Sequence, residues 1–374
     1  ADIVGYDSVS AVLFPYGASF VAAPAGANTT IADISAVGFV SARQVVLLAD
    51  RSHLYTANLT FGDDRGLREV EFLSDTYLNY TYKLDSEGLV VRPGAVLVST
   101  ESPPEIFHCL LEQPASASVS CRTFVNASSF LSAKHNQGFE SLCATPSGAR
   151  LVTATEASLS IDADGVVRLA SYSMTADGVA VPDRELAYLV EDDHRPPLRL
   201  VELLALDDSA LEGGRLLALE RGYSPETGDH IRLQLVDTAG ATDVLGCEAL
   251  GTSSCAAASG GFAAGGRVTP VAKREIFRWT DDQPLGGHVP VDNYEGMALV
   301  PLEAFGEQAQ DSAAGGIWLL LVNDNNNNAD QIGTQFVLLR LIASAVDGDP
   351  PHKAGPRPAP VALAAALLLA ACAC

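Results

Sequence analysis

The chain is poor in basic residues for its length. Its 374 residues contain 23 Lys and Arg against 46 Asp and Glu, which gives a formal net charge of −23. A field of that sign repels nucleic acid and anionic membranes, and it concentrates cations. We therefore expect no nucleic-acid partner, and an anionic substrate would need a bound metal or a local arginine cluster to offset the field. Acidity that serves solubility alone is the plainer alternative.

Several catalytic signatures are also missing. The seven histidines show no H-E-x-x-H spacing, and there is no P-loop, dinucleotide fingerprint or basic aromatic stripe. The Asn-rich run that begins at Asp324 lacks the Gly and the final Glu of an EF-hand loop. Its Asn side chains are instead expected to cap turns, because Asn tolerates left-handed backbone. Gly222-Tyr-Ser-Pro-Glu226 lacks the last glycine of a nucleophile elbow.

The cysteines are spaced for local disulfides rather than for zinc. Cys109 and Cys121 are close in sequence, as are Cys247 and Cys255, and no C-x-x-C pair has a matching His or Cys partner. We expect two local disulfides and no metal–thiolate site. Four N-x-[ST] sequons agree with an oxidising, secretory context. They lie at Asn28, Asn58, Asn79 and Asn126.

The end of the chain forms a segment of its own. Residues 346–374 contain a polar, Pro-rich spacer and then an uncharged apolar stretch from Pro360 to Cys374. That stretch is shorter than the about 20 residues that span a bilayer as a helix. Together with the small residues before the spacer, it has the order of a GPI-attachment signal. A plain disordered tail is the alternative. We expect a secreted or extracellular cell-surface protein that meets a membrane only through such an anchor.

Residues 1–345 are predicted to form one all-β domain built from a repeated unit. A Glu-Gly pair opens an apolar run at Glu295-Gly296, and related forms recur at Glu87-Gly88, Glu140 and Glu212-Gly213. In each unit a second apolar run ends on an acidic residue. The strand-ending acids are Asp50, Glu101, Glu156, Glu220 and Asp324. The last interval is about twice the others, which leaves room for a further unit around Arg267 to Trp279. Repeats of about 40 to 60 residues without long amphipathic helices are typical of β-propellers. The sequence predicts a single propeller of about six four-stranded blades, with a disordered C-terminal tail.

In a propeller the innermost strands run parallel to the central channel, so equivalent strand ends converge at one mouth. Acids repeated at that position would form a ring, whose like charges raise their pKa values or recruit a cation. Oxygen ligands of this kind favour calcium. The predicted metal ligands are Glu87, Glu101, Glu140, Glu156 and Asp324. The predicted catalytic residues are Glu295, Asp324, Glu220 and Arg221. Alternatively, each acid pairs with neighbouring backbone or arginine, since Arg51 and Arg221 directly follow two of the acids.

Four segments of the chain resemble the esterase-like phytase domain family. They are Asp292–Ala298, Leu219–Tyr223, Leu84–Gly88, and Leu320–Asn326 followed by Thr334-Gln-Phe336. The similarity runs from about Val37 to Leu341. It implies a propeller-like fold and phosphoester hydrolysis. The first unit departs from the family pattern at Ser35–Gly38 and at Ala49–Arg51. The resemblance therefore does not imply that the first blade contributes to the site.

Taken together, these features predict a monomeric hydrolase of small-molecule phosphoesters or other anionic substrates. The Arg-His-Gly run of histidine-acid phytases is absent. Hydrolysis would therefore need a bound cation, one carboxylate to activate water, and Arg221 to stabilise the phosphoryl oxygens. The alternative is a non-catalytic propeller that uses the same mouth to hold a ligand or glycan.

Overall fold

The computed structural model describes residues 3–23, 26–80, 85–111, 116–127, 130–190, 197–252, 255–257, 267–306 and 316–343. These residues form 24 β-strands and one short 3-10 helix, η2 (Leu302–Phe305). None of the described residues lies in a helix long and apolar enough to cross a membrane. The predicted spacer and apolar tail at 346–374 lie outside the described residues.

Most of the strands assemble into three four-stranded sheets and one eight-stranded sheet, and the latter consists of two four-stranded halves joined through β7 and β11. We call the resulting five four-stranded units blades 1 to 5. Blade 1 contains β4 (Ile34–Phe39), β5 (Gln44–Ala49), β6 (His53–Phe61) and β7 (Leu67–Asn79). Blade 2 contains β8 (Ser86–Arg92), β9 (Ala95–Thr100), β10 (Glu105–Leu110) and β11 (Ser118–Asn126). Blade 3 contains β12 (Phe139–Ala144), β13 (Arg150–Thr155), β14 (Val166–Met174) and β15 (Ala180–Leu189). Blade 4 contains β16 (Arg199–Ala205), β17 (Arg215–Ser224), β18 (Gly228–Asp237) and β21 (Ala272–Thr280). Blade 5 contains β22 (Tyr294–Leu299), β23 (Ile317–Asn323), β24 (Thr334–Ala343) and β1 (Ile3–Phe14).

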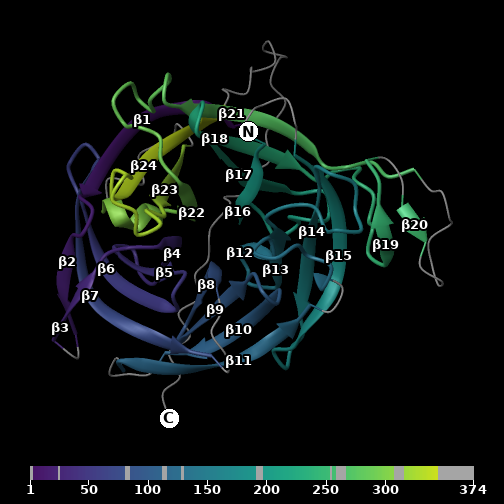
Figure 1. Cartoon of the computed structure of the whole chain (residues 1–374), viewed down its shortest axis with the longest axis horizontal. Helices are drawn as coiled ribbons and strands as arrows, with labels where there is room; N and C mark the ends of the chain where they lie inside the picture. The colour runs from purple at the N-terminus through teal and green to yellow at the C-terminus, as the bar shows by residue number, and fades with distance from the viewer. Residues whose placement is uncertain are drawn as a thin grey trace, which may run out of the picture.

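The blades close into a ring around a common centre (Figure 1), with β4, β8, β12, β16 and β22 innermost. Each innermost strand contacts the innermost strand of the next blade, and β22 contacts β4 to complete the circle. The N-terminal β1 pairs with β24, so that both ends of the described chain complete blade 5. Blades 1 and 2 are further joined by a short parallel pairing between β7 and β11.

Packing between blades explains the apolar runs of the sequence. One apolar cluster fills each interface between neighbouring blades, which makes five around the ring. The second strand of each blade is covered on both faces, and β5 is accordingly buried from Val45 to Ala49. The outermost strand β7 instead alternates between buried and exposed residues. The two patterns differ because β5 is buried on both faces, whereas β7 is buried on only one.

The all-β propeller is confirmed, but the described residues contain five blades rather than about six. The extra unit predicted around Arg267 to Trp279 is the outermost strand of blade 4, β21. A long insertion separates β21 from β18 in the sequence, and this insertion produced the apparent extra repeat. Two hairpins lie outside the blades. They are β2 (Ser19–Ala22) with β3 (Ala27–Thr30), and β19 (Cys247–Leu250) with β20 (Cys255–Ala257).

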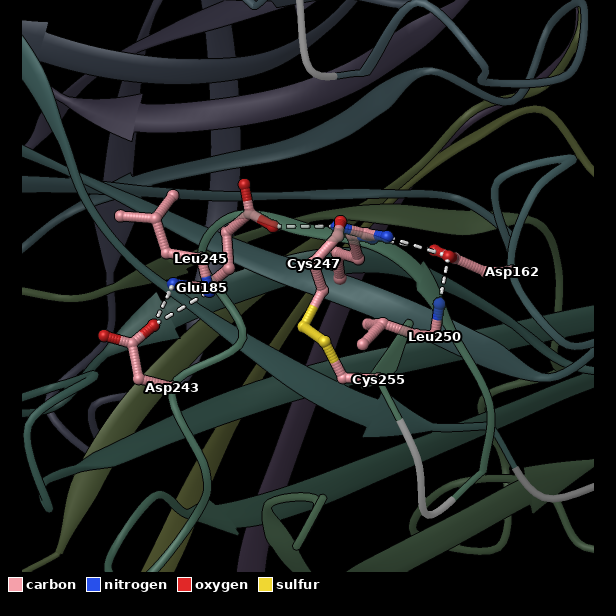
Figure 2. Close-up of a disulfide and its surroundings, with 8 residues drawn as sticks. Asp162, Glu185, Asp243, Leu245, Cys247, Leu250 and Cys255 are labelled. Atoms are coloured by element: carbon pink, nitrogen blue, oxygen red, sulfur yellow. Dashed lines mark hydrogen bonds and ion pairs between the residues drawn. A yellow bond between two sulfur atoms is a disulfide. The ribbon is translucent and has the colours of Figure 1, made fainter. Parts of the chain in front are cut away.

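Both predicted disulfides are present. Cys109–Cys121 joins the paired strands β10 and β11, and Cys247–Cys255 closes the β19–β20 hairpin. Figure 2 shows that hairpin held against blade 3, where the backbone N–H of Leu250 donates to Asp162 at 2.7 Å. The buried Arg168 of β14 donates to the Cys247 carbonyl at 3.0 Å and pairs with Asp162 and Glu185. The described β19–β20 hairpin is therefore fixed to the neighbouring blade.

Candidate functional site

The first strand of every blade carries an irregularity at the same place. Where the first and second strands pair, the register shifts at one end of the channel. One residue is left between two paired ones in each blade except blade 2, where Glu87 and Gly88 are both left. These bulged positions are Ser35, Glu87, Glu140, Val201 and Glu295. A bulge re-aims the side chain that it carries. Three blades thus turn a glutamate toward one end of the channel, which we call the mouth.

The second strands contribute a second set of side chains to the mouth. The second-strand residues that pair with the position directly before each bulge are Ala49, Thr100, Thr155, Glu220 and Asn323. The next residue in each blade therefore occupies the equivalent mouth position. Those residues are Asp50, Glu101, Glu156, Arg221 and Asp324. Blade 4 thus presents Arg221 where the other four blades present an acid.

This register places Glu220 elsewhere than the sequence analysis expected. Side chains alternate along a strand, so a slip of one residue moves Glu220 to the opposite face from Arg221. Its fully buried carboxylate accepts hydrogen bonds from Tyr188 at 2.7 Å and Gln234 at 3.2 Å, and it pairs with Lys273 at 2.8 Å. Glu220 therefore belongs to a network between blades 3 and 4 and does not join the acids of the mouth.

A third set lies two residues before each bulge. It consists of Asp33, Asp85, Gly138, Arg199 and Asn293. The backbone N–H of the second-strand acid donates to the carbonyl of this residue in blades 1, 2, 3 and 5, at 2.8 to 3.3 Å. Sequence analysis missed Asp85 and Arg199 as site residues. Asp85 had a visible signal, because Asp85-Ser-Glu-Gly88 and Asn293-Tyr-Glu-Gly296 share their spacing.

Blades 1 to 3 form an acidic side of the mouth. Ligand oxygens of Glu87, Glu101 and Glu140 lie within 4.8 Å of one another, and the same holds for Asp50, Asp85 and Glu87. Glu101 is 3% exposed and Glu140 is 6% exposed, yet the Oε2 atom of each has no hydrogen-bond partner among the described residues. Burial first, and repulsion from nearby carboxylates second, raises the pKa values of Asp50, Glu87 and Glu140 well above their usual range.

Two glycines make this close approach sterically feasible. A Cβ on Gly88 would lie 2.4 Å from the backbone nitrogen of Leu142, and a Cβ on Gly138 would lie 1.9 Å from the carbonyl oxygen of Glu101. Neither backbone atom can move away cheaply. The missing side chains let blades 2 and 3 approach closely, which brings Glu87 and Glu101 against Glu140.

Blade 4 forms a basic side of the mouth together with its neighbours. Arg221 pairs with Glu295 at 3.0 Å and with Glu156 at 3.4 Å, and it donates to the side-chain oxygen of Asn293. Arg199 pairs with the other oxygen of Glu156 at 2.5 Å. Burial acts to lower the pKa of Arg221, but Glu295 and Glu156 raise it above its ordinary value. Glu156, predicted as a metal ligand, is thus held between two arginines.

Asp324 lies between the two sides. The Asn293 amide is 3.4 Å from one of its oxygens, and the Asn326 backbone N–H donates to the other at 2.7 Å. Burial, and then repulsion from Glu295, raises the pKa of Asp324 well above its usual range. Asn326 and Asn327 have φ values of 47° and 45°, so Asn does serve the left-handed turn positions expected of it.

The acidic side fits a hard divalent cation. Its donors are all carboxylate oxygens, which calcium and similar ions prefer, and two buried oxygens have no other partner. Next to the basic side lies a cavity of about 500 Å³ whose lining includes Glu156, Arg199, Lys134 and Gln137. The mouth therefore combines a place for a cation with arginines and a cavity that can receive the rest of a ligand.

Two solved structures of low sequence identity align with most of the chain. A luciferin-regenerating enzyme aligns over 83% of this chain and 92% of its own at 10% identity, with a TM-score of 0.36. The WD40 β-propeller domain of Doa1 aligns over 87% of this chain and 96% of its own at 10% identity, with a TM-score of 0.34. A comparison with curated protein sequences found no match.

The comparison with family models gives a more specific result. A model described as Phytase-like, esterase-like activity of phytase, matches residues 29–327. That range takes in every strand from β4 to β23, and with them all the mouth residues of the five blades. It also confirms the resemblance to this family, and all of the quoted segments except Thr334-Gln-Phe336 lie within the matched range. The chain belongs to the Phytase-like family.

Proposed function

We propose that the protein is a cation-assisted phosphoester hydrolase whose reaction takes place at the mouth. The family suggests a hydrolase-type β-propeller. The observation that carries the proposal is the division of the mouth into two sides. Three buried glutamates converge on the acidic side, and Arg221 with Arg199 stands on the basic side. A phosphate ester carries the charge that both a cation and arginines attract.

In this proposal Glu87, Glu101 and Glu140 hold the cation, with calcium as the expected ion. When bound, the cation supplies positive charge that polarises the phosphoryl group and offsets the carboxylates. Glu156 and Asp324, also predicted as ligands, belong to neither close group of carboxylates among the described residues. Glu156 instead orients the arginines, because its two oxygens contact Arg199 and Arg221.

Arg221 stabilises the phosphoryl oxygens. Its planar guanidinium matches the geometry of two oxygens, and its buried Nε atom has no hydrogen-bond partner in the part of the chain that the structure describes. Asp324 accepts the proton of the attacking water. Glu295 is the less suitable acceptor because it pairs with Arg221 at 3.0 Å, which offsets its negative charge. The cavity beside Arg199 receives the alcohol part of the ester.

Phosphate release from phytate and from a chromogenic phosphate monoester tests the proposal. We expect hydrolysis with calcium, and its loss after chelation. The absence of hydrolysis in both conditions, with protein shown to be folded by circular dichroism, would reject the proposal.

The second candidate is a propeller that binds a ligand or glycan at the same mouth without turnover. It is favoured by one observation, namely that the terminal nitrogens of Arg221 already contact Asn293, Glu156 and Glu295. An oxyanion would have to compete with these contacts. Separate Glu295→Gln and Asp324→Asn variants distinguish the two functions. Lowered thermal stability with unchanged hydrolysis would mark both residues as structural.

We also propose that the protein is secreted or displayed on the cell surface as a monomeric glycoprotein, with GPI attachment as the expected anchor. The two disulfides are compatible with an oxidising compartment. Of the four sequon residues, Asn28, Asn79 and Asn126 are exposed, while Asn58 is partly buried and accepts a hydrogen bond from Gln44. A mass shift on deglycosylation of protein from its native cells tests the glycans. Phospholipase release from membranes tests the anchor.

A further inference from the structure

The proposed cation at Glu87, Glu101 and Glu140 leaves part of the acidic side unexplained. Asp50 of blade 1 and Asp85 of blade 2 also have ligand oxygens within 4.8 Å of Glu87 and of each other. The two groups of three carboxylates therefore share one member. Glu87 is the shared residue, and it comes from the bulge in β8.

Glu87 itself is a buried side chain. It is 8% exposed, and among the described residues no hydrogen bond or ion pair reaches its carboxylate. By contrast, the Asp50 carboxylate accepts a hydrogen bond from the Ser35 hydroxyl. Burying a carboxylate is costly unless a compensating charge is nearby. A carboxylate has two oxygens, so Glu87 can face Asp50 and Asp85 with one and Glu101 and Glu140 with the other.

The clustered negative charges on the acidic side also favour bound cations. Five carboxylates gather here, namely Asp50, Asp85, Glu87, Glu101 and Glu140. The nearby arginines pair with other acids. Arg51 pairs with Asp33 at 2.9 Å, and Arg221 and Arg199 pair with Glu156 and Glu295. A cation at Glu87, Glu101 and Glu140 would occupy one end of this group, and Asp50 and Asp85 form its other end.

We propose that the mouth binds two hard divalent cations, the second held by Asp50, Asp85 and Glu87, with Glu87 bridging the pair. This inference rests on the cation site of the proposed function. It extends that site into blade 1, whose departures from the family pattern had placed its role in doubt. In two-cation phosphoester sites of this general kind, paired charges clamp the oxygens on both sides of the reacting group.

Calcium binding to the full chain, measured by equilibrium dialysis at pH 7.5 after chelator treatment, tests the proposal without reference to activity. We expect two calcium ions per chain. Asp85→Asn should lose one ion and Glu101→Gln should lose the other, while Glu87→Gln should weaken both. Glu71→Gln removes an equal charge from an exposed position of β7 and should still bind two. Circular dichroism confirms that each variant is folded.

The outcomes separate this inference from the proposed function. One calcium ion in the wild-type protein would overturn the second site and leave the hydrolase proposal standing. Two ions in Asp85→Asn as well as in the wild type would overturn the assignment of the second site. Two ions lost one by one, in a protein that hydrolyses no phosphoester, would support the inference and reject the hydrolase. Binding of no calcium would overturn both.

Discussion

Blades 2 and 4 present opposite charges from equivalent backbone positions. Blade 2 carries Asp85, Glu87 and Glu101, whereas blade 4 carries Arg199, Val201 and Arg221. The pairing of first and second strands shifts register at the same place in both blades. The fold therefore supplies a set of repeated positions, and the side chains there decide what the mouth attracts. A fully symmetric ring of acids would hold cations but would repel a phosphate.

The largest effect is expected from removing the charge of blade 4. Arg221→Met leaves Glu156 and Glu295 buried with less compensation, and breaking a buried pair costs about 3–5 kcal/mol. It should also lower phosphoester hydrolysis by about 100-fold or more, since a lost oxyanion donor has that effect. Urea denaturation and phosphate release measure the two effects.

Arg68→Met is the matched control for this change. Arg68 pairs with Asp64 on the surface, with 56% and 63% of the side chains exposed. Exposed pairs of that kind contribute only about 0–1 kcal/mol. If the two variants lost similar stability, Arg221 would not compensate buried charge at the mouth.

Removing an acid from blade 2 should raise the free energy of unfolding, whereas removing Arg221 from blade 4 should lower it. Glu87→Gln relieves repulsion among the carboxylates, so at pH 8 without cations it should raise the free energy of unfolding by about 1 kcal/mol. With calcium present, the same change should reduce the stabilisation that the ion provides. Melting temperatures with chelator and with calcium check both signs. A loss of stability in chelator would show that Glu87 has a stabilising partner.

The pH dependence of stability sharpens the comparison further. Burial raises the pKa of Glu101 to about 7, above its ordinary value of 4.5. The folded state then binds more protons than the unfolded state between these values, so metal-free stability should fall as pH rises from about 4.5 to 7. Calcium binds the ionised form, so its stabilising effect should be small at pH 5 and larger at pH 8. Thermal unfolding at several pH values, with and without calcium, measures this. A calcium effect independent of pH would contradict it.

The sequence predicted much of the acidic side and less of the basic side, for identifiable reasons. Glu87 and Glu295 are each followed by glycine. These Glu-Gly pairs lie at the bulges, and they form a motif that repeats in the sequence. Blade 4 lacks that motif, because Val201 occupies the bulge, so the sequence alone did not indicate which residue of its second strand faces the mouth. The equivalence of Arg221 with Asp324 becomes visible only when the strands are paired.

Contacts between distant segments also escaped the sequence analysis. The side-chain oxygen of Asn325 accepts a hydrogen bond from the backbone N–H of Asp33 at 3.2 Å, although the two residues are 292 positions apart in the sequence. It thereby joins blade 5 to blade 1 at the mouth, a role that no local pattern indicates. The pairing of β1 with β24 is a long-range contact of the same kind, and it fixes the number of blades.

The smallest effect on the mouth is expected at the residue next to Arg221. Glu220→Gln loses the charge that compensates Lys273 between blades 3 and 4, so it should destabilise the protein by about 1–3 kcal/mol. Because Glu220 faces away from the mouth, calcium binding and the Michaelis constant for a phosphoester should stay unchanged. Equilibrium dialysis and steady-state kinetics below the melting temperature measure these quantities. Loss of a calcium ion in this variant would mean that the strand register at Arg221 is displaced by one residue, and that the charge contrast between blades 2 and 4 does not hold.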